Sequence, residues 1–579
     1  MDKHAVALVL EEIGTLLDLA GENRFKARAF HNAARAIDKT EEDVGALART
    51  GDLEGVAGIG RATAAVIREL VETGSSRYLA ELRERTPPGF RELLAVPGLG
   101  VTKVRQLHRQ LGIATVADLE RAAAEGRIAG VRGFGERMQE RIAHGVRFVR
   151  GGAGRRRLSR AIESADRVVG HVRALPGVKR AELAGELRRC CETVAGVDIV
   201  AAVDVRSERR VLEAFAAQPG AARGEALDAE HAEAVLGDGL ALRLRCVAPP
   251  AFAAAWIHAT GSAAHVDGLR VAAELASLRL DGNGLWRGEE RVATDDEEEV
   301  YAALALDFVP PELREEGRAE ILAAAERGLP RLVQYEDLRG CFHCHTTDSD
   351  GRATLEELAA GAIARGWRYL GVADHSEAAF YAGGLSLDQI ERQHRAIDAW
   401  NAQRGDALWL FKGIEADILV DGTLDYTDAG DVLQRFDYVV GSVHSSFALP
   451  RAQMTKRLVT AVRNPHLTFL GHATGRLLLM REGYAVDMDA VIDAAADRGA
   501  AIEINADPHR MELDWRYWPD AKRKGVKTAV NPDAHSVRDL DYVRLGMTVA
   551  RKGWLETADV INTWELDEVK AYFERKGQA

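Results

Sequence analysis

Two histidines one residue apart, His343 and His345, offer the first recognisable chemistry in this sequence. They lie in a short strand-like segment, and side chains two residues apart point to the same face of a strand. Both imidazoles can therefore reach one metal ion, and Asp350 follows where the chain turns. Such a pair also occurs by chance, so two core histidines are the alternative interpretation.

Further ligand-type residues follow the ends of later hydrophobic runs. They are His375, Glu415, His444, His472, Asp533 and His535. Helical stretches such as 354–365 and 488–498 separate these runs. Strand, ligand and helix in repeated order are typical of a (βα) barrel, which builds its site from the C-terminal ends of its strands. Nine such residues on six strand ends predict a multinuclear metal site, because they cannot all be core residues.

The motifs around these residues resemble those of the PHP (polymerase and histidinol phosphatase) superfamily, from about Leu338 to the C-terminus. They comprise residues 343–345, 350, 373–376, 413–417, 442–444, 471–472 and 533–535. The resemblance implies a distorted seven-stranded barrel with three divalent metal ions. Zinc and manganese are the ions usual in that superfamily, and the ligand types also suit iron(II).

The resemblance also implies how these ions would be held. One would bind His343, His345, Glu415 and Asp533, a second would share Glu415 with His444 and His472, and a third would bind Asp350, His375 and His535. Metal ions about 4 Å apart can clamp the entering and leaving oxygens of a phosphate ester, so no protein nucleophile is needed. Asp374 is a candidate acceptor that fixes the tautomer of His375, with an exposed salt bridge as the alternative.

Length and composition indicate a multidomain globular protein. The 579 residues suggest three or four domains, and 47% hydrophobic with 28% charged residues is ordinary. No apolar run reaches membrane-spanning length and no signal-peptide pattern is present, so we expect a cytoplasmic protein without a membrane partner. The five cysteines form no disulfide framework. A net charge of −13 argues against indiscriminate coating of DNA but leaves local contacts open.

Residues 1–150 are helical and arginine-rich, and one turn pattern occurs in them three times. In each copy a hydrophobic-Gly-hydrophobic-Gly sequence opens a helix, with glycines at Gly58 and Gly60, Gly98 and Gly100, and Gly133 and Gly135. The pattern resembles the helix-hairpin-helix module, whose N–H groups at the helix start bind a phosphate without reading bases. Three copies favour non-sequence-specific binding of the DNA backbone over turns that merely join helices.

The chain up to about residue 325 resembles the family X DNA polymerases. The resemblance rests on basic and aromatic residues at 23–35, on the hairpins, on palm-like residues 184–200 and on the later turn at 260–265. In lyase-active members, a lysine after the first hairpin forms a Schiff base with an abasic sugar. Val66 stands at that position here, so we expect no β-elimination by that route.

The palm-like region departs from the family at its metal site. Gly196 replaces the first Asp, Asp198 remains, and Arg243 replaces the third, so too few anionic oxygens remain for magnesium. Gly185-Glu186 replaces the phosphate-binding Gly-Ser turn. At ~4 Å, Glu186 would repel a triphosphate by about 4 kcal/mol, roughly a thousandfold in binding. We expect no polymerisation. Arg243 should pair internally with Asp198 or Glu186, with a DNA backbone contact as the alternative.

The predicted fold class is multidomain. It combines an N-terminal all-α helix-hairpin-helix region, an α+β palm and thumb, and a C-terminal α/β PHP barrel of the distorted (βα)7 type. The predicted boundaries are 1–82 for the N-terminal DNA-binding domain, 83–150 for a fingers-like domain, 151–250 for the palm, 251–327 for the thumb, 328–337 for a linker and 338–579 for the barrel.

The predicted function is metal-dependent hydrolysis of DNA phosphodiesters in repair. We expect a 3′→5′ exonuclease, with cleavage at abasic sites and removal of 3′-phosphates as further activities. The expected partner is gapped or 3′-ended DNA, bound by a monomer, with Arg188, Arg189, Arg476 and Lys456 as candidate phosphate contacts. Three alternatives stay open: an active gap-filling polymerase, a phosphatase for small monoesters, and a non-catalytic scaffold that binds DNA ends.

Overall fold

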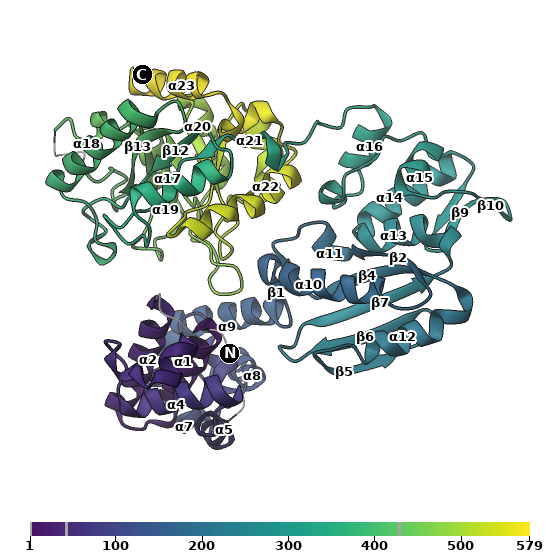
Figure 1. Cartoon of the computed structure of the whole chain (residues 1–579), viewed down its shortest axis with the longest axis horizontal. Coiled ribbons are helices and arrows are strands. Elements are labelled where there is room, and N and C mark those ends of the chain that lie inside the picture. Colours follow the sequence, from purple (N-terminus) through teal and green to yellow (C-terminus); the bar gives the residue numbers. More distant parts are fainter. Residues whose placement is uncertain (1–2, 41–43, 88, 427–429, 579) are drawn as a thin grey trace. The chain divides into compact units, whose positions relative to one another are not determined.

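The computed structural model describes residues 3–40, 44–87, 89–426 and 430–578 (Figure 1). The chain divides into two compact units, Met1–Ala153 and Gly154–Ala579. Among these described residues, no helix has both the length and the apolar character needed to cross a bilayer. All five cysteines are free thiols.

The first unit is entirely helical. Its helices are α1 (Lys3–Ala20), α2 (Arg24–Lys39), α3 (Val44–Thr50), α4 (Arg61–Thr73), α5 (Arg77–Arg85), α6 (Phe90–Leu94), α7 (Val101–Leu111), α8 (Val116–Ala124) and α9 (Gly135–Gly152). One hydrophobic core, from Val6 to Val146, receives side chains from every one of them. The stretches 1–82 and 83–150 therefore share a single core.

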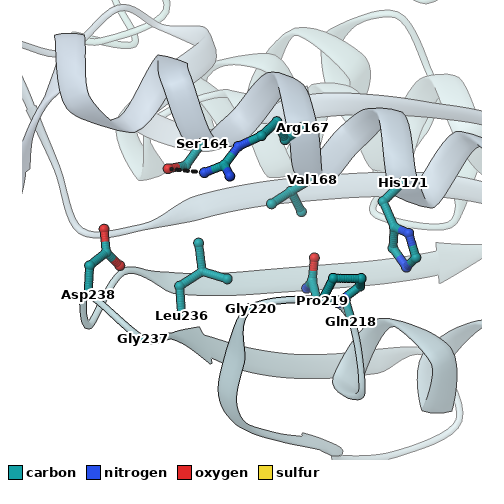
Figure 2. Close-up of a pocket in the computed structure, with 10 residues that line it drawn as sticks. All are labelled: Ser164, Arg167, Val168, His171, Gln218, Pro219, Gly220, Leu236, Gly237 and Asp238. Atoms are coloured by element: carbon teal, nitrogen blue, oxygen red, sulfur yellow. Dashed lines mark hydrogen bonds between the residues drawn. The ribbon is translucent and has the colours of Figure 1, made fainter. Parts of the chain in front are cut away.

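The second unit begins with the palm-like region. Its mixed sheet has the order β2 (Val178–Ala184), β4 (Val197–Val203), β7 (Ala241–Val247), β6 (His231–Leu236) and β5 (Ala221–Ala226). Only β4 and β7 run parallel. The sheet is accompanied by the helices α10 (Leu158–Arg173), α11 (Gly185–Arg188) and α12 (Glu208–Ala216). A cavity of about 450 Å³ lies between α10 and the β5 and β6 ends (Figure 2), and no predicted metal ligand lines it.

The thumb-like region follows the palm-like sheet. Its elements are α13 (Phe252–Thr260), α14 (Ala263–Leu275), the antiparallel strands β8 (Arg279–Asp281), β9 (Gly284–Arg287) and β10 (Glu290–Val292), then α15 (Glu297–Ala303) and α16 (Ala319–Ala325). A hydrophobic cluster that includes Ile257, Leu285 and Tyr301 holds these elements together. The α+β character predicted for residues 151–327 is therefore confirmed.

The C-terminal region is a barrel of seven parallel strands arranged in chain order. They are β11 (Gly340–Cys341), β12 (Tyr369–Val372), β13 (Trp409–Asp417), β14 (Tyr438–Ser442), β15 (Phe469–Leu470), β16 (Ala501–Asn505) and β17 (Thr528–Asn531). A parallel bridge from Cys344 to Ala534 links the segments after the first and last strands. The helices are α17 (Leu355–Ala364), α18 (Leu387–Arg404), α19 (Arg451–Val462), α20 (Met488–Arg498), α21 (Trp518–Arg523), α22 (Val543–Lys552) and α23 (Leu566–Gln578). The predicted distorted (βα)7 barrel is confirmed.

An aromatic cluster fills one part of the barrel. The ring of Phe342 lies 5.4 Å from those of Tyr369 and Phe573, and 5.6 Å from that of Phe469. Space is so tight that a Cβ on Gly413 would come within 2.1 Å of the Tyr438 ring. This packed interior holds the strands in register, and because all seven are parallel, their C-terminal ends meet at one end of the barrel.

Candidate metal centre

The nine predicted ligands meet at the C-terminal ends of the barrel strands. They are His343 and His345 after β11, Asp350 on the same loop, His375 after β12, Glu415 in β13, His444 after β14, His472 after β15, and Asp533 and His535 after β17. The parallel topology brings together residues that lie up to 192 positions apart in the chain, as 535 − 343 shows. The structure thus gathers every predicted ligand into one cluster.

Glu415 lies at the middle of this cluster and is 1% exposed. Its Oε1 atom is 3.0 Å from His472 Nε2, 3.3 Å from His444 Nε2 and 3.4 Å from His343 Nε2. Its Oε2 atom is 2.9 Å from His375 Nδ1. His345 Nε2 lies 3.7 Å from the same Oε2 atom, so one carboxylate faces five imidazoles, which is the arrangement that a bridging ligand requires.

Two aspartates complete the cluster on either side of His345. Asp533 Oδ1 is 3.2 Å from His345 Nε2, and Asp350 Oδ1 is 3.7 Å from His345 Nδ1. Asp350 Oδ1 also lies 3.3 Å from His535 Nε2 and 3.7 Å from His375 Nε2. The two ring nitrogens of His345 thus face different carboxylates.

Among the described residues, three groups of side chains have their ligand atoms within 4.8 Å of one another. The groups are His345, Asp350, His375 and His535; His343, His345 and Glu415; and His375, Glu415 and His444. In this part of the described chain, the buried atoms His343 Nε2 and His345 Nδ1 make no hydrogen bond. Buried ring nitrogens that make no hydrogen bond are costly, and imidazole with carboxylate suits zinc, manganese or iron(II), so these residues fit a divalent metal site.

Glu415 and His444 shift each other's pKa values toward the charged forms. Burial alone would raise the pKa of Glu415, but His444, His343 and His375 outweigh it and hold the pKa well below its usual range. Burial alone would lower the pKa of His444, but Glu415 and Asp417 raise it to about 10. Without a metal, protonated imidazoles compensate the carboxylates, so metal binding must release protons.

Two carboxylates that orient the ligands were not among the predicted site residues. Glu503 in β16 is fully buried, and its Oε1 accepts a hydrogen bond from His343 Nδ1 at 2.7 Å. Asp417 Oδ1 lies 2.6 Å from His444 Nδ1. Such contacts fix the tautomer and turn the other ring nitrogen toward the metal. Sequence signals existed, because Glu503 interrupts an apolar strand and Asp417 shares a strand face with Glu415.

Both interpretations of Asp374 were wrong. This residue is fully buried, so it forms no exposed salt bridge. Its carboxylate accepts hydrogen bonds from the N–H of Thr346 at 2.8 Å, the hydroxyl of Thr346 at 2.7 Å and Nε2 of Gln393 at 2.7 Å. Asp374 therefore holds the loop after β11 in place and does not orient His375.

Charged residues of the palm-like site form ion pairs within the protein. Asp198 and Arg243 are register partners on β4 and β7, with Arg243 Nε 2.5 Å from Asp198 Oδ1 and Nη2 3.2 Å from Oδ2. Glu186 pairs with Arg155 at 2.8 Å. The internal pairing of Arg243 with Asp198 is thus found. A Cβ on Gly196 would lie 2.6 Å from the Ala241 carbonyl oxygen, so an Asp there would require the backbone to move.

Three of the four candidate phosphate contacts are already engaged within the protein. Arg188 Nη2 lies 2.6 Å from buried Glu297, and Arg189 Nε lies 3.0 Å from Glu315. Arg476 Nη1 lies 2.9 Å from Asp514. These three guanidiniums pair with acids of the protein, of which Glu297 is buried and Glu315 and Asp514 are partly buried, while Lys456 is exposed on α19.

Contacts between the barrel and the preceding regions also fix Arg189. Lys552 at the end of α22 is 1% exposed and donates to the Arg189 carbonyl oxygen at 3.0 Å. Its ammonium also contacts the Glu315 carboxylate that pairs with Arg189. Arg551 Nε donates to Glu312 Oε1 at 2.7 Å. Arg189 is therefore part of a buried charge network and is unavailable to DNA.

The hairpin glycines have the conformations that the helix-hairpin-helix pattern requires. The first glycine of each pair is left-handed, with φ of +97°, +90° and +88° at Gly58, Gly98 and Gly133. The helices α4, α7 and α9 begin at or directly after the second glycine. A Cβ on Gly60, Gly100 or Gly135 would meet nothing within 4 Å, so the space outside each helix start is open to a phosphate.

Fold and site together define a class of protein, in which a PHP-type phosphoesterase barrel is joined to a family X polymerase module. Comparison with known families agrees. The PHP domain matches residues 342–507, and the DNA polymerase beta thumb matches residues 255–315. A helix-hairpin-helix domain matches residues 1–76, and a SAM-like helix-hairpin-helix tandem matches residues 90–147. The helix-hairpin-helix and thumb regions indicate DNA binding.

A full-length relative narrows this class. The chain is 33% identical to the DNA polymerase/3′-5′ exonuclease PolX of Bacillus subtilis (strain 168), over 99% of this chain and 100% of the relative. It therefore belongs to the PolX family. The barrel region is also similar to a probable phosphatase of Caldicellulosiruptor saccharolyticus, with 30% identity over 34% of this chain and 80% of that protein. These relationships support a metal-dependent hydrolase.

Proposed function

We propose that this chain hydrolyses DNA phosphodiesters at the barrel site as a 3′→5′ exonuclease and that it does not polymerise. It would act as a monomer on gapped or 3′-ended DNA in the cytoplasm. The observation that carries the proposal is the nine-residue cluster around the buried Glu415, in a chain that also has helix-hairpin-helix regions. Cleavage at abasic sites and removal of 3′-phosphates are proposed as further activities, because both also hydrolyse a phosphate ester.

The ligands are proposed in the grouping that the family resemblance implies. Divalent ions bound there supply activation of water and neutralisation of phosphate charge. Two carboxylates orient the ligands: Glu503 accepts a hydrogen bond from His343, and Asp417 pairs with His444. Arg510 adds a cation: its Nε lies 3.9 Å from Asp533 Oδ2, and its Nη1 lies 3.7 Å from Glu512 Oε1. This guanidinium can hold a phosphate oxygen.

The loss of polymerisation is proposed from the palm-like site. Asp198 is the one carboxylate left of three, and Arg243 neutralises it. Magnesium requires several anionic oxygens, which this site does not offer. A Cβ on Gly196 would lie 2.6 Å from the Ala241 carbonyl oxygen, which supports the proposal because an Asp at this position would require the backbone to move.

One gel assay tests the main proposal. 5′-labelled primer–template DNA is incubated with the protein and manganese, with and without dNTPs. A ladder of shortened products that disappears with chelator, without extension, is the expected result. Extension with dNTPs would refute the lost polymerase, and absence of shortening would refute the exonuclease.

Variants connect the activity to the cluster. His375→Ala and Asp533→Ala should abolish shortening while DNA binding persists, because both side chains belong to the cluster and lie outside the hairpins. His466→Ala is the matched control, since this histidine lies in the barrel outside the cluster. Hydrolysis of small monoesters by a protein that leaves DNA intact would favour the second candidate, a phosphatase like the relatives of the barrel region.

A further inference from the structure

Exposed apolar side chains in the barrel are concentrated at the end where the ligands meet. Among the described barrel residues, the exposed large hydrophobic side chains are Ile363, Phe380, Tyr381, Leu387, Leu419, Val420, Met480 and Tyr517. Ile363 lies in α17 and Leu387 is the first residue of α18, while the others lie in the connections that follow the C-terminal ends of strands. Because the strands are parallel, these connections surround the same end of the barrel as the cluster.

Phe380 and Tyr381 are the two aromatic residues of this rim that stand beside the cluster. They are 85% and 62% exposed, although large aromatic rings are usually buried. The Tyr381 ring centroid lies 6.4 Å from the rings of both His375 and His444. The two aromatic rings contact each other edge to face at 6.0 Å. An exposed aromatic surface thus adjoins the metal ligands directly.

The loop that carries this pair is firmly anchored. The N–H of Leu385 donates to the His375 carbonyl oxygen at 2.8 Å, which closes the loop at its base. The N–H of Ala378 donates to Asp425 Oδ2 at 2.7 Å. A Cβ on Gly384 would lie 1.8 Å from the Ser376 carbonyl oxygen, so the chain is tightly packed there. The two rings are therefore held outward by a defined backbone.

We propose that Phe380 and Tyr381 form a stacking platform for an unpaired nucleobase of the DNA strand cleaved at the metal centre. The inference rests on the proposed function and specifies its substrate as a strand with unpaired bases at its 3′ end. Aromatic side chains bind any base through its π-face, which suits a nuclease without sequence preference. A protein partner bound to these rings would cover the metal centre, whereas a single DNA strand can pass across the rings into the centre.

The test removes the nucleobase from the DNA in one arm and the aromatic ring from the protein in the other. Single-turnover cleavage is measured on a single-stranded oligonucleotide and on the same strand with a tetrahydrofuran residue in place of its 3′-terminal nucleoside. The wild type should cleave the abasic strand roughly five- to hundredfold more slowly. Phe380→Ala and Tyr381→Ala should lose about the same factor on intact DNA and respond little to base removal. Phe380→Trp, which keeps an aromatic ring, should cleave intact DNA at about the wild-type rate.

Cleavage of a strand made entirely of tetrahydrofuran residues, a phosphodiester chain without any aromatic ring, reports on the metal centre in each variant. The ratio of the oligonucleotide rate to this rate should fall in both alanine variants. Ile363→Ala, an equally simple truncation of an exposed side chain away from the rim, should keep the wild-type ratio. Unchanged ratios in Phe380→Ala and Tyr381→Ala would overturn the stacking platform alone. A wild-type protein that cleaves neither this strand nor intact DNA would overturn the proposed function, and the platform with it.

Discussion

The substitution Glu503→Gln tests whether the metal ligands depend on a carboxylate behind them. Each oxygen of Glu503 accepts two hydrogen bonds in the structure. Oε1 accepts from His343 Nδ1 at 2.7 Å and Asn531 Nδ2 at 3.0 Å, and Oε2 accepts from the His472 N–H at 2.9 Å and Asn505 Nδ2 at 3.1 Å. Glutamine has nearly the same shape but only one acceptor oxygen.

The magnitude follows from this count. In either orientation of the amide, two donors face an NH2 group instead of an acceptor. A buried donor without a partner costs about 1–3 kcal/mol, so we expect a loss of roughly 2–6 kcal/mol in the free energy of unfolding of the metal-free barrel. Loss of the partner that orients His343 should also lower metal affinity about 10- to 100-fold.

Two measurements check this prediction. Denaturant unfolding of the chelated protein gives the stability, and competition with a chromophoric chelator gives the metal affinity. Glu565→Gln is the control, because this glutamate is 63% exposed in its side chain. If Glu503→Gln matches the wild type in both measurements, the carboxylate does not orient the site, and the reasoning from hydrogen-bond partners is wrong.

Further predictions concern stability and pH. Saturating manganese should stabilise the barrel against heat, by about 2.7 kcal/mol at a hundredfold excess over Kd, and chelator should remove this gain in a thermal scan. Glu297→Ala should cost about 3–5 kcal/mol in denaturant unfolding, because it leaves Arg314 buried and Arg188 unpaired. Burial lowers the pKa of His394 to about 4, so the unfolded chain binds more protons between pH 6.5 and 4 and stability falls as pH drops through that range. In His394→Phe, this loss of stability at low pH should be smaller by about 1 kcal/mol, a figure reduced for solvent screening. If the free energy of unfolding falls equally with pH in the variant and the wild type, His394 is not the cause. Gly196→Asp with Arg243→Asp should still incorporate no dNTP, and incorporation would show that the backbone at Gly196 yields.

The sequence alone was enough to predict the elements of the barrel and the candidate ligands that the fold brings together. Most of the ligand-type residues follow an apolar run, and a parallel strand must bring that position to the same end of a barrel as its neighbours. The same reasoning identified the hairpin glycines, because a left-handed turn before a helix requires a residue without a Cβ. The palm-like departures, such as Arg243 in place of an Asp, are visible in the residue types themselves.

Other features were decided only by the tertiary structure. Glu503 lies 160 residues from His343, and no local pattern states which buried acid meets which imidazole. Arg188 and Arg189 look like phosphate contacts in the sequence, yet folding brings Glu297 and Glu315 to them. The exposure of Phe380 likewise depends on what packs around its loop. Local sequence sets strand, turn and helix, whereas pairing of buried charges and exposure of rings depend on which distant segments meet, because only contact removes water from a side chain.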